Sequence, residues 1–337
     1  RLFERRIRMD TAIASAPAGH YLDSFLAPLA SWLSREDVTD IYVNRPGEVW
    51  IESLGGAIER HEDPALTEQL LGRLARQIAA HGSQGISRAA PLLAASLPDG
   101  SRVQIIAPPA TREGHVLAIR RHVKAEFSLS DWHDSEAFVG LKRGEAAIDR
   151  ERVWCTVGES EAPALLADAV RARRNIIVAG GTSSGKTTFL NALLAEMPRH
   201  ERLLTIEDTE ELRIEHPNSV GLIAARGRLA EADVSAEDLL IAALRMRPDR
   251  IILGELRGSE AFTFLRAVNT GHPGSMTSIH ADTPQRAIEQ LALLVLQTGS
   301  RLSREDVRHY VRESIDVFVQ LERREGRRRV AQVMVAE

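Results

Sequence analysis

The sequence predicts two domains of different class, a smaller α+β domain followed by a larger α/β domain built on a parallel sheet. The chain has 337 residues, which is longer than one typical domain. Its first half combines helical patterns with short alternating strands, whereas its second half alternates buried β-rich runs with helical ones. We therefore place the first domain at residues 1–140, a linker at 141–160 and the second domain at 161–337.

The composition is that of a globular protein and narrows the possible functions. Hydrophobic residues make up 44% of the chain and charged residues 27%. The net charge of -4 gives no overall attraction to nucleic acid, so we expect no sequence-specific nucleic-acid binding. The single cysteine, Cys155, excludes an intramolecular disulfide and a cysteine-rich zinc site. No apolar run approaches the roughly 18 residues that span a bilayer, and nothing resembles a signal peptide.

The first half predicts a helix, a β-hairpin, a second helix and further antiparallel strands. Residues 21–34 are apolar at helical spacing and lead into VTDIYVN and VWIE, which the turn RPGE joins. Apolar residues then recur every fourth position from Leu66 to Ile78, and Gly82 is the expected helix stop. The runs PLLAASL, RVQIIAP and HVLAIRRH alternate as strands do. The stretch 128–160 predicts a helical piece followed by the linker.

The second half predicts a parallel sheet covered by helices. Its β-rich runs are NIIVAG, RLLTIED, VGLIAA, RIILGE and GSMTSIH, and between or after them lie TTFLNALLAEM, SAEDLLIAALRM, SEAFTFLRAVNT and TPQRAIEQLALLVLQ, which are helical in period. Ser235 with Asp238 three residues later forms a capping box at the start of one of these helices. Ligands of such sheets gather at the carboxyl ends of the strands.

The motif GGTSSGKT follows the strand NIIVAG directly and precedes an apolar helix. It fits G-x-x-x-x-G-K-[ST] in the strand–loop–helix context that a P-loop requires. Glycines let backbone N–H groups surround phosphate, Lys186 reaches the β and γ phosphates, and the Thr187 hydroxyl is a ligand for Mg²⁺. The sequence thus predicts an α/β P-loop NTPase domain with a RecA-like parallel sheet, with ATP and Mg²⁺ as cofactors. The expected nucleotide-binding residues are Gly180, Gly181, Thr182, Ser183, Ser184, Gly185, Lys186, Thr187 and Thr188.

Acidic residues at two strand ends predict the hydrolytic part of this site. RIILGE resembles the magnesium-side strand of P-loop ATPases, although Gly254 stands where many of them have Asp, so Glu255 acts alone there. A carboxylate near the γ phosphate can orient or polarise the attacking water. Glu207 and Asp208 end the strand of RLLTIED, where they could hold magnesium-bound water. The other acidic residues of that stretch are expected to be solvated.

The stretch TGHPGSMTSIHAD contains His272 and His280. A metal site is the least favoured interpretation, because only Asp282 is at hand as a further ligand. For His272, an ordinary loop role and a functional role stay open. His280 ends the strand GSMTSI beside the strand of Glu255, so we expect it to donate a hydrogen bond to the γ phosphate or to a polar relay and to report hydrolysis to the next helix.

These motifs together resemble a known superfamily. The order GGTSSGKTT, LLTIEDTEEL, ALRMRPDRIILGELRG and NTGHPGSMTSIHAD is similar to the P-loop, acidic box, magnesium-side motif and histidine box of the secretion traffic ATPases, which drive type II and type IV secretion and type IV pili. SREDVTDIYVNRPGEVWIE resembles the start of that superfamily's N-terminal domain. Type II members usually carry a four-cysteine zinc module, which a chain with one cysteine cannot form. Within the superfamily, this chain is most similar to the VirB-cluster ATPases of type IV secretion systems.

The resemblance implies a ring-shaped homohexamer at the cytoplasmic face of the bacterial inner membrane. It would use ATP to assemble the apparatus or pass substrates into it, with other secretion components as partners. The resemblance also places Arg102 and Arg120 where members present arginines to the nucleotide phosphates. The alternative is a pair of exposed strand arginines, and Arg121 beside Arg120 leaves the choice between those two open.

Two questions of function stay open at this point. The cluster from Arg323 to Arg329 reads as the charged tip of a hairpin, with peripheral contact to anionic lipid as the alternative. A DNA-translocating motor and a P-loop small-molecule kinase are the other functions considered. The negative net charge counts against the first, and the sequence contains no separate acceptor-binding pattern for the second.

Overall fold

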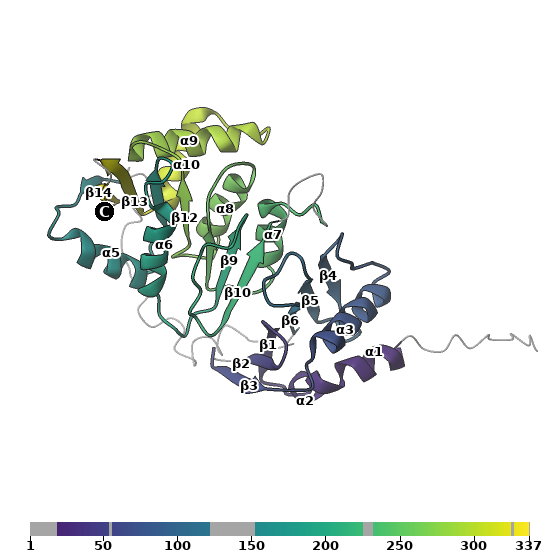
Figure 1. The fold of residues 1–337 in the computed structure, drawn as a ribbon. Coiled ribbons are helices and arrows are strands. Elements are labelled where there is room, and N and C mark those ends of the chain that lie inside the picture. The colour runs from purple at the N-terminus through teal and green to yellow at the C-terminus, as the bar shows by residue number, and fades with distance from the viewer. Residues whose placement is uncertain (1–18, 54–55, 122–151, 225–231, 325–326, 337) are drawn as a thin grey trace, which may run out of the picture.

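The computed structural model describes residues 19–53, 56–121, 152–224, 232–324 and 327–336. These residues form two domains, each built on one sheet (Figure 1). The helical piece expected after residue 128 lies outside them. No helix in the described ranges is both long and apolar enough to cross a membrane.

The N-terminal domain is a six-stranded antiparallel sheet with helices packed on it, as predicted. Its strands follow the order β3-β2-β1-β6-β5-β4. The expected hairpin is present, and Ile41 of its first strand lies opposite Ile51 of its second. The strands are β1 (Val38–Val43), β2 (Glu48–Ser53), β3 (Ile58–Glu62), β4 (Leu92–Ser96), β5 (Arg102–Ile106) and β6 (Val116–Arg120).

Both helices predicted for this domain are found. The first is divided into α1 (Gly19–Leu26), a 3₁₀ turn η1 (Ala27–Leu29) and α2 (Ala30–Leu33), with Pro28 in the 3₁₀ turn. The second is α3 (Glu68–His81), which begins where the Thr67 side chain accepts a hydrogen bond from the Leu70 N–H and ends at Gly82. Its buried face packs into the apolar core of the domain.

The C-terminal domain is an eight-stranded, mostly parallel sheet in the order β10-β9-β11-β12-β8-β13-β14-β7. The five β-rich runs of the sequence are its parallel strands, and β13 is parallel to β8 as well. The strands are β7 (Trp154–Thr156), β8 (Ile176–Gly180), β9 (Leu203–Glu207), β10 (Ser219–Ile223), β11 (Arg250–Leu253), β12 (Met276–Ile279), β13 (Val317–Arg324) and β14 (Arg327–Ala336).

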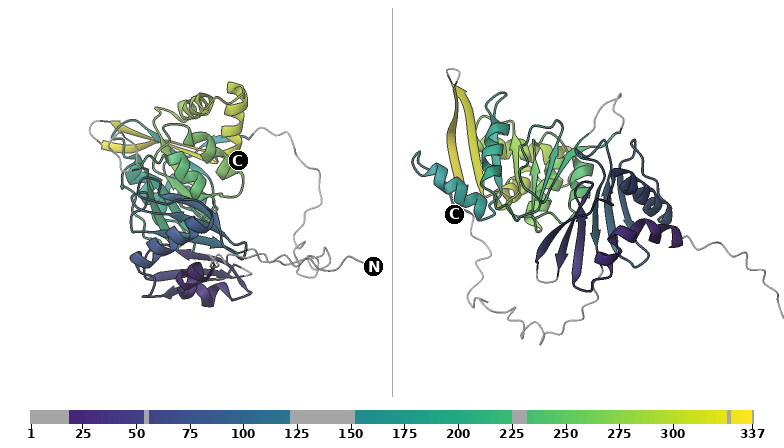
Figure 2. Two further views of the ribbon diagram at one scale, coloured as in Figure 1. Left: turned by 90° about the vertical axis from the view of Figure 1, so that its right-hand side faces the viewer. Right: turned by 60° about the horizontal axis from the view of Figure 1, so that its bottom comes forward.

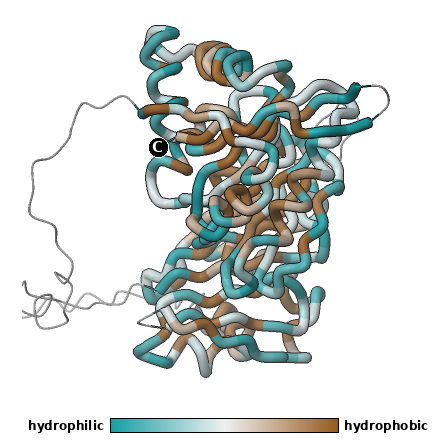
Figure 3. Tube along the Cα trace, turned by 90° about the vertical axis from the view of Figure 1, so that its left-hand side faces the viewer, coloured by the Kyte–Doolittle hydropathy of each residue, from teal (hydrophilic) through white to brown (hydrophobic). Residues whose placement is uncertain are grey.

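Helices cover both faces of this sheet. Alternate residues of β8 point to opposite faces. Ile176 and Val178 pack with α5 and α6, whereas Ile177 and Ala179 pack with the four later helices. Figure 3 shows the hydrophobic segments in the interior of the molecule, between the helices and the sheets. The helices are α5 (Ala162–Arg171), α6 (Lys186–Ala195), α7 (Ala236–Ala243), α8 (Glu260–Asn269), α9 (Pro284–Gln297) and α10 (Arg304–Ser314).

One boundary differs from the sequence-based expectation. Residues 154–156 lie inside the stretch assigned to the linker, 141–160, yet they form β7 and pair with β14. The run is short and only partly buried, so its sequence carries no clear strand pattern. Sequence reasoning also left β3, α5 and α10 unassigned, although α10 has a capping box between Ser303 and Asp306.

The two domains meet along the free edge of β10. Thr111, in the turn between β5 and β6, forms an isolated bridge with Leu222. The Arg112 N–H donates to the Gly221 carbonyl (3.2 Å), and the Ile223 N–H donates to the Ala110 carbonyl (3.0 Å). These hydrogen bonds satisfy backbone groups that an edge strand otherwise exposes. Figures 1 and 2 show the N-terminal sheet against this end of the second sheet.

A buried polar group adds to the same interface. Arg202 is fully buried and donates to the side-chain oxygens of Asn44 (2.7 Å) and Asn218 (2.6 Å). Its guanidinium also lies 4.0 Å from the centre of the Tyr42 ring. Because Tyr42 and Asn44 belong to the N-terminal domain, part of the bonding of the Arg202 guanidinium depends on the contact between the two domains.

Candidate functional site

The predicted P-loop joins β8 to α6 at the carboxyl edge of the second sheet. Gly185 has φ +96°, a left-handed conformation that favours glycine, and α6 begins at the next residue, Lys186. The loop forms one wall of a cavity of about 470 Å³. Residues 182–188 line it, and the ends of β9, β11 and β12 supply further side chains, among them Glu207, Asp208, Glu255, Ser278 and His280.

Lys186 is folded back over its own loop. Its Nζ donates hydrogen bonds to the carbonyls of Gly180 (3.1 Å) and Gly181 (3.3 Å) and lies 3.5 Å from Oε1 of Glu255. Burial lowers the pKa of the Lys186 ammonium, and the Glu255 carboxylate opposes that shift. The ammonium therefore lies between the loop and the predicted catalytic carboxylate.

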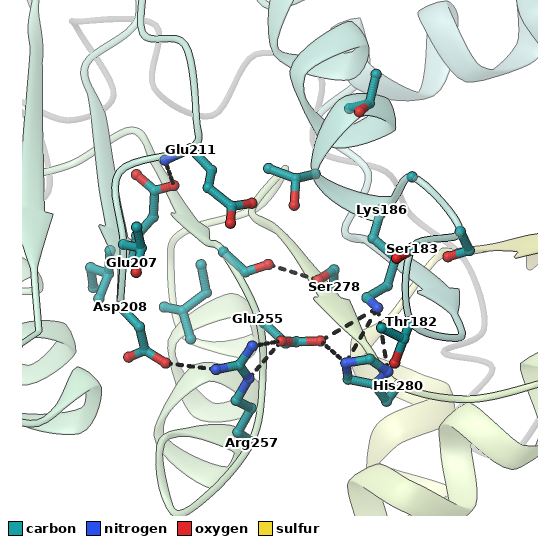
Figure 4. A pocket seen from close by; sticks show the side chains of 18 of the residues that line it. Thr182, Ser183, Lys186, Glu207, Asp208, Glu211, Glu255, Arg257, Ser278 and His280 are labelled. Atoms are coloured by element: carbon teal, nitrogen blue, oxygen red, sulfur yellow. Dashed lines mark hydrogen bonds and ion pairs between the residues drawn. The ribbon is translucent and has the colours of Figure 1, made fainter. Parts of the chain in front are cut away.

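Glu255 lies just past the end of β11 and is surrounded by cationic or ionisable nitrogen groups (Figure 4). Oε1 is 2.9 Å from Nε2 of His280. Oε2 pairs with the guanidinium of Arg257, whose other end is 3.1 Å from Asp208. Lys186 completes the group. The structure thus brings together four residues that the sequence assigns to the site, and adds Arg257.

Glu207 lies close to Gly254, the residue before Glu255. A Cβ atom on Gly254 would lie 3.2 Å from Cγ of Glu207, which occupies the neighbouring position on β9. The Oε1 atom of Glu207 accepts hydrogen bonds from the backbone N–H groups of Glu211 (2.9 Å) and Leu212 (2.8 Å). Its Oε2 atom pairs with Arg112 of the N-terminal domain. Glu207 therefore lines the cavity but uses its oxygens to hold the following loop and the domain contact.

The loop residues fit a phosphate-bearing ligand. The Ser184 hydroxyl is buried at the cavity and has no hydrogen-bond partner among the described residues. A buried unpartnered hydroxyl is costly unless a ligand or water completes its bonding. The hydroxyls of Thr187 and Thr188 line the same cavity, on the first turn of α6, whose N-terminal N–H groups favour an anion.

Comparison with known proteins agrees with this geometry. The family model described as type II/IV secretion system protein matches residues 151–334, more than half of the chain. The chain belongs to the type II/IV secretion ATPase family. The resemblance inferred from the four motifs, and the ATPase class that it implied, are therefore confirmed at the level of the family.

Several members of this secretion ATPase family match nearly the whole chain. The type IV secretion system protein VirB11 of Bartonella henselae is 37% identical over 91% of this chain and 91% of its own length. PtlH of Bordetella pertussis is 42% identical over 93% of this chain and 94% of its own. The crystal structure of the VirB11 ATPase of Brucella suis superposes with a TM-score of 0.81 at 36% identity, over 93% of this chain and 96% of that one. The predicted two-domain fold is confirmed.

Two predicted site residues, Arg102 and Arg120, do not line the P-loop cavity. Arg102 on β5 and Arg120 on β6 are directly opposite each other and exposed. They line a cleft of about 830 Å³ that also contains Arg245, just past α7. In the described part of the chain, every residue lining the P-loop cavity comes from the C-terminal domain. Arg121 instead donates to backbone carbonyls, including that of Val38 (3.1 Å), so Arg120 is the exposed member of that pair.

The two histidines of the secretion ATPase motif lie at opposite ends of β12. His272 precedes the strand, and its Nδ1 is 3.1 Å from the Pro248 carbonyl. Burial lowers the pKa of the His272 imidazole. His280 follows the strand and reaches Glu255. The two rings therefore do not converge on a common ligand.

Sequence reasoning missed Arg257, Ser278, Arg112 and Arg328. Arg257 is two residues after Glu255, in the segment that follows β11 at the carboxyl edge of the sheet, and this position was an available signal. The Ser278 hydroxyl donates to the Gly254 carbonyl (2.7 Å) and so ties β12 to the strand of Glu255. Arg112 comes from a distant segment that no local pattern marks, and Arg328 belongs to the basic cluster that the sequence assigned to a hairpin tip rather than to this site.

Proposed function

We propose that this chain binds ATP with Mg²⁺ on the P-loop and couples hydrolysis to a bacterial type IV secretion system. One observation carries the proposal: Oε1 of Glu255 lies 3.5 Å from Nζ of Lys186 and 2.9 Å from Nε2 of His280, beside the P-loop. The type IV secretion relatives match over almost the full length of the chain, which supports the biological process.

The residues of the loop have distinct tasks in this proposal. Lys186 exchanges its contacts with the Gly180 carbonyl and Glu255 for phosphate oxygens, and the Ser184 hydroxyl gains a partner. The Thr187 hydroxyl would hold Mg²⁺, which would supply positive charge to the phosphates when bound. The backbone N–H groups at the start of α6 bind the remaining phosphate oxygens.

The residues opposite the loop act on water and on the γ phosphate. Glu255 orients and polarises the attacking water once Lys186 no longer holds it. His280 donates a hydrogen bond to the γ phosphate or to Glu255 and so links hydrolysis to α9, which begins at Pro284. Asp208 is better placed than Glu207 to hold magnesium-bound water, because it is exposed at the cavity and pairs with Arg257 through Oδ2, whereas both oxygens of the buried Glu207 have protein partners.

The proposal extends to assembly and location. We propose a ring-shaped homohexamer at the cytoplasmic face of the inner membrane, where other secretion components are its partners and membrane contact is peripheral. Arg102 and Arg120 act in a neighbouring subunit, since they are exposed in a cleft separate from the P-loop of their own chain. Residues 1–140 and 161–337 remain our proposed domains, joined by a linker at 141–160 that contains β7 (Trp154–Thr156).

Sedimentation and ATP turnover, measured on the same samples with and without DNA, test the proposal. A secretion ATPase should hydrolyse ATP only as an oligomer, without a phosphoryl acceptor and without stimulation by DNA. Lys186→Ala is the control for turnover at this site. Turnover that required DNA would favour a translocase, and turnover that required a second substrate would favour a kinase.

A further inference from the structure

The hairpin of β13 and β14 runs past the P-loop. Leu321 of β13 lies opposite Gly180, the last residue of β8. β13 continues to Arg324, so its final residues extend beyond the carboxyl edge of the sheet, beside the loop. Figure 2 shows this hairpin as the long yellow pair of strands at the side of the sheet.

Arg328, on the returning strand β14, reaches the loop from this hairpin. It lines the P-loop cavity together with Lys186 and Thr187. A Cβ atom on Gly185 would lie 3.0 Å from Cδ of Arg328 and 3.7 Å from its Nε. The aliphatic part of Arg328 therefore packs on the glycine that precedes α6, which places a second cation at the cavity.

The positive charge of the hairpin is poorly balanced. Arg323 lies opposite Arg328, and Arg324 lies opposite Arg327. Like charges directly across a strand pair are destabilising. Glu322 pairs with Arg329, but no hydrogen bond or ion pair joins Arg328 to any other residue that the structure describes. An anion bound at the cavity would offset this repulsion.

We propose that Arg328 is a phosphate-binding residue of the nucleotide site, acting on the phosphates that ATP and ADP share. A guanidinium presents a fork of N–H donors that matches phosphate oxygens, and such charge-assisted bonds are strong. Because Arg328 packs on the loop itself, it stabilises the bound nucleotide rather than the attacking water. The inference rests on the proposed function, since it takes the P-loop as an ATP site.

Calorimetric titration of ADP, a non-hydrolysable ATP analogue and adenosine into the full chain tests this inference. We expect Arg328→Ala to weaken ADP and the analogue by roughly tenfold or more, the usual value of one hydrogen bond to a charged group. Adenosine affinity should not change. Arg328→Lys should recover part of the loss, and the difference from wild type should shrink as salt screens the charge.

Arg327→Ala is the matched control, because it removes the same charge from the adjacent position on β14, where the side chain points to the other face. It should bind ADP within about twofold of wild type, since surface charges act weakly at a distance. Equal losses in the two variants, or unchanged ADP binding by Arg328→Ala, would overturn the inference while leaving the ATP site intact. Loss of anionic-vesicle binding with normal ADP binding would assign the hairpin to a membrane instead. A wild-type chain that bound no nucleotide would contradict the proposed function itself.

Discussion

At the scale of single residues, the carboxylate of Glu255 is stabilised by the groups that the proposed reaction must rearrange. Lys186, His280 and Arg257 all lie against it, and its side chain is only 14% exposed. Phosphate competes directly for Lys186, because the same ammonium reaches both the loop and Glu255. Nucleotide binding and release of Glu255 are therefore coupled through one side chain.

This coupling separates two substitutions in the same cavity. Glu255→Gln keeps the shape of the side chain and removes its charge, so we expect ATP to bind while turnover falls by about a hundredfold or more. Lys186→Ala removes the cation that neutralises phosphate, so binding itself should be lost. Equilibrium binding of an ATP analogue and steady-state hydrolysis measure the two effects. Near-normal turnover by Glu255→Gln would remove Glu255 from the mechanism.

The two histidines provide a matched pair for the proposed sensor. His280→Ala should keep the fold and bind ATP within a few-fold of wild type, yet lose turnover, because His280 reaches Glu255 (2.9 Å). His272→Ala removes an imidazole at the other end of β12, where it contacts the Pro248 carbonyl, so its turnover should stay near normal. Circular dichroism checks the fold of both variants. Equal turnover in the two would contradict the role of His280.

At the scale of elements, neighbouring strands of the second sheet share limited space at the site. Gly254 on the β11 side faces Glu207 of β9, and the hydroxyl of Ser278 from β12 donates to the Gly254 carbonyl. An aspartate at position 254 would put a second carboxylate against Glu207. Glycine at position 254 avoids this steric and electrostatic conflict with Glu207.

Gly254→Asp should consequently destabilise the protein by about 1–3 kcal/mol, the usual range for overpacking, because the new side chain would press on Glu207. Gly158→Asp is the control, since a Cβ there would meet no heavy atom within 4 Å. Thermal unfolding followed by circular dichroism should show a lower Tm for the first variant alone. An unchanged Tm for Gly254→Asp would show that Glu207 can move aside, and that the space argument is wrong.

The elements also show what the sequence could predict. Long amphipathic patterns and buried β-rich runs marked α3, α9 and the parallel strands, because periodicity is a local property. The P-loop, Glu255 and His280 were found for the same reason: each ends or follows a strand whose carboxyl edge carries the site. The strand β7 was not predicted, because a run of three partly exposed residues is too short to show a period in its hydrophobic pattern. Arg112 and Arg328 were not assigned to the site, because only the folded chain brings Arg112 to Glu207 and Arg328 to Gly185.

At the scale of the whole molecule, the N-terminal domain reaches the site through Arg112. Arg112 pairs with Glu207, which lines the P-loop cavity, while the backbone on either side of Arg112 bonds to the edge of β10. The exposed arginines of the same domain, Arg102 and Arg120, line a different cleft. Arg112 therefore joins the two domains of its own chain, as Arg202 does through Asn44, whereas Arg102 and Arg120 are exposed and can face another molecule.

If Arg102 serves the nucleotide of a neighbouring subunit, two inactive variants should complement each other in one ring. Lys186→Ala lacks a working P-loop but retains Arg102, and Arg102→Ala is the reverse. When the two chains are co-expressed with different tags and mixed rings are isolated, about a quarter of the sites should combine an intact loop with an intact arginine. ATP turnover should recover to about that fraction.

Lys186→Ala with Glu255→Gln is the control, because both residues line the same cavity of one chain, so no mixed site is complete. Recovery in the first mixture alone supports the action of Arg102 across the subunit boundary, whereas no recovery in either mixture would contradict that action.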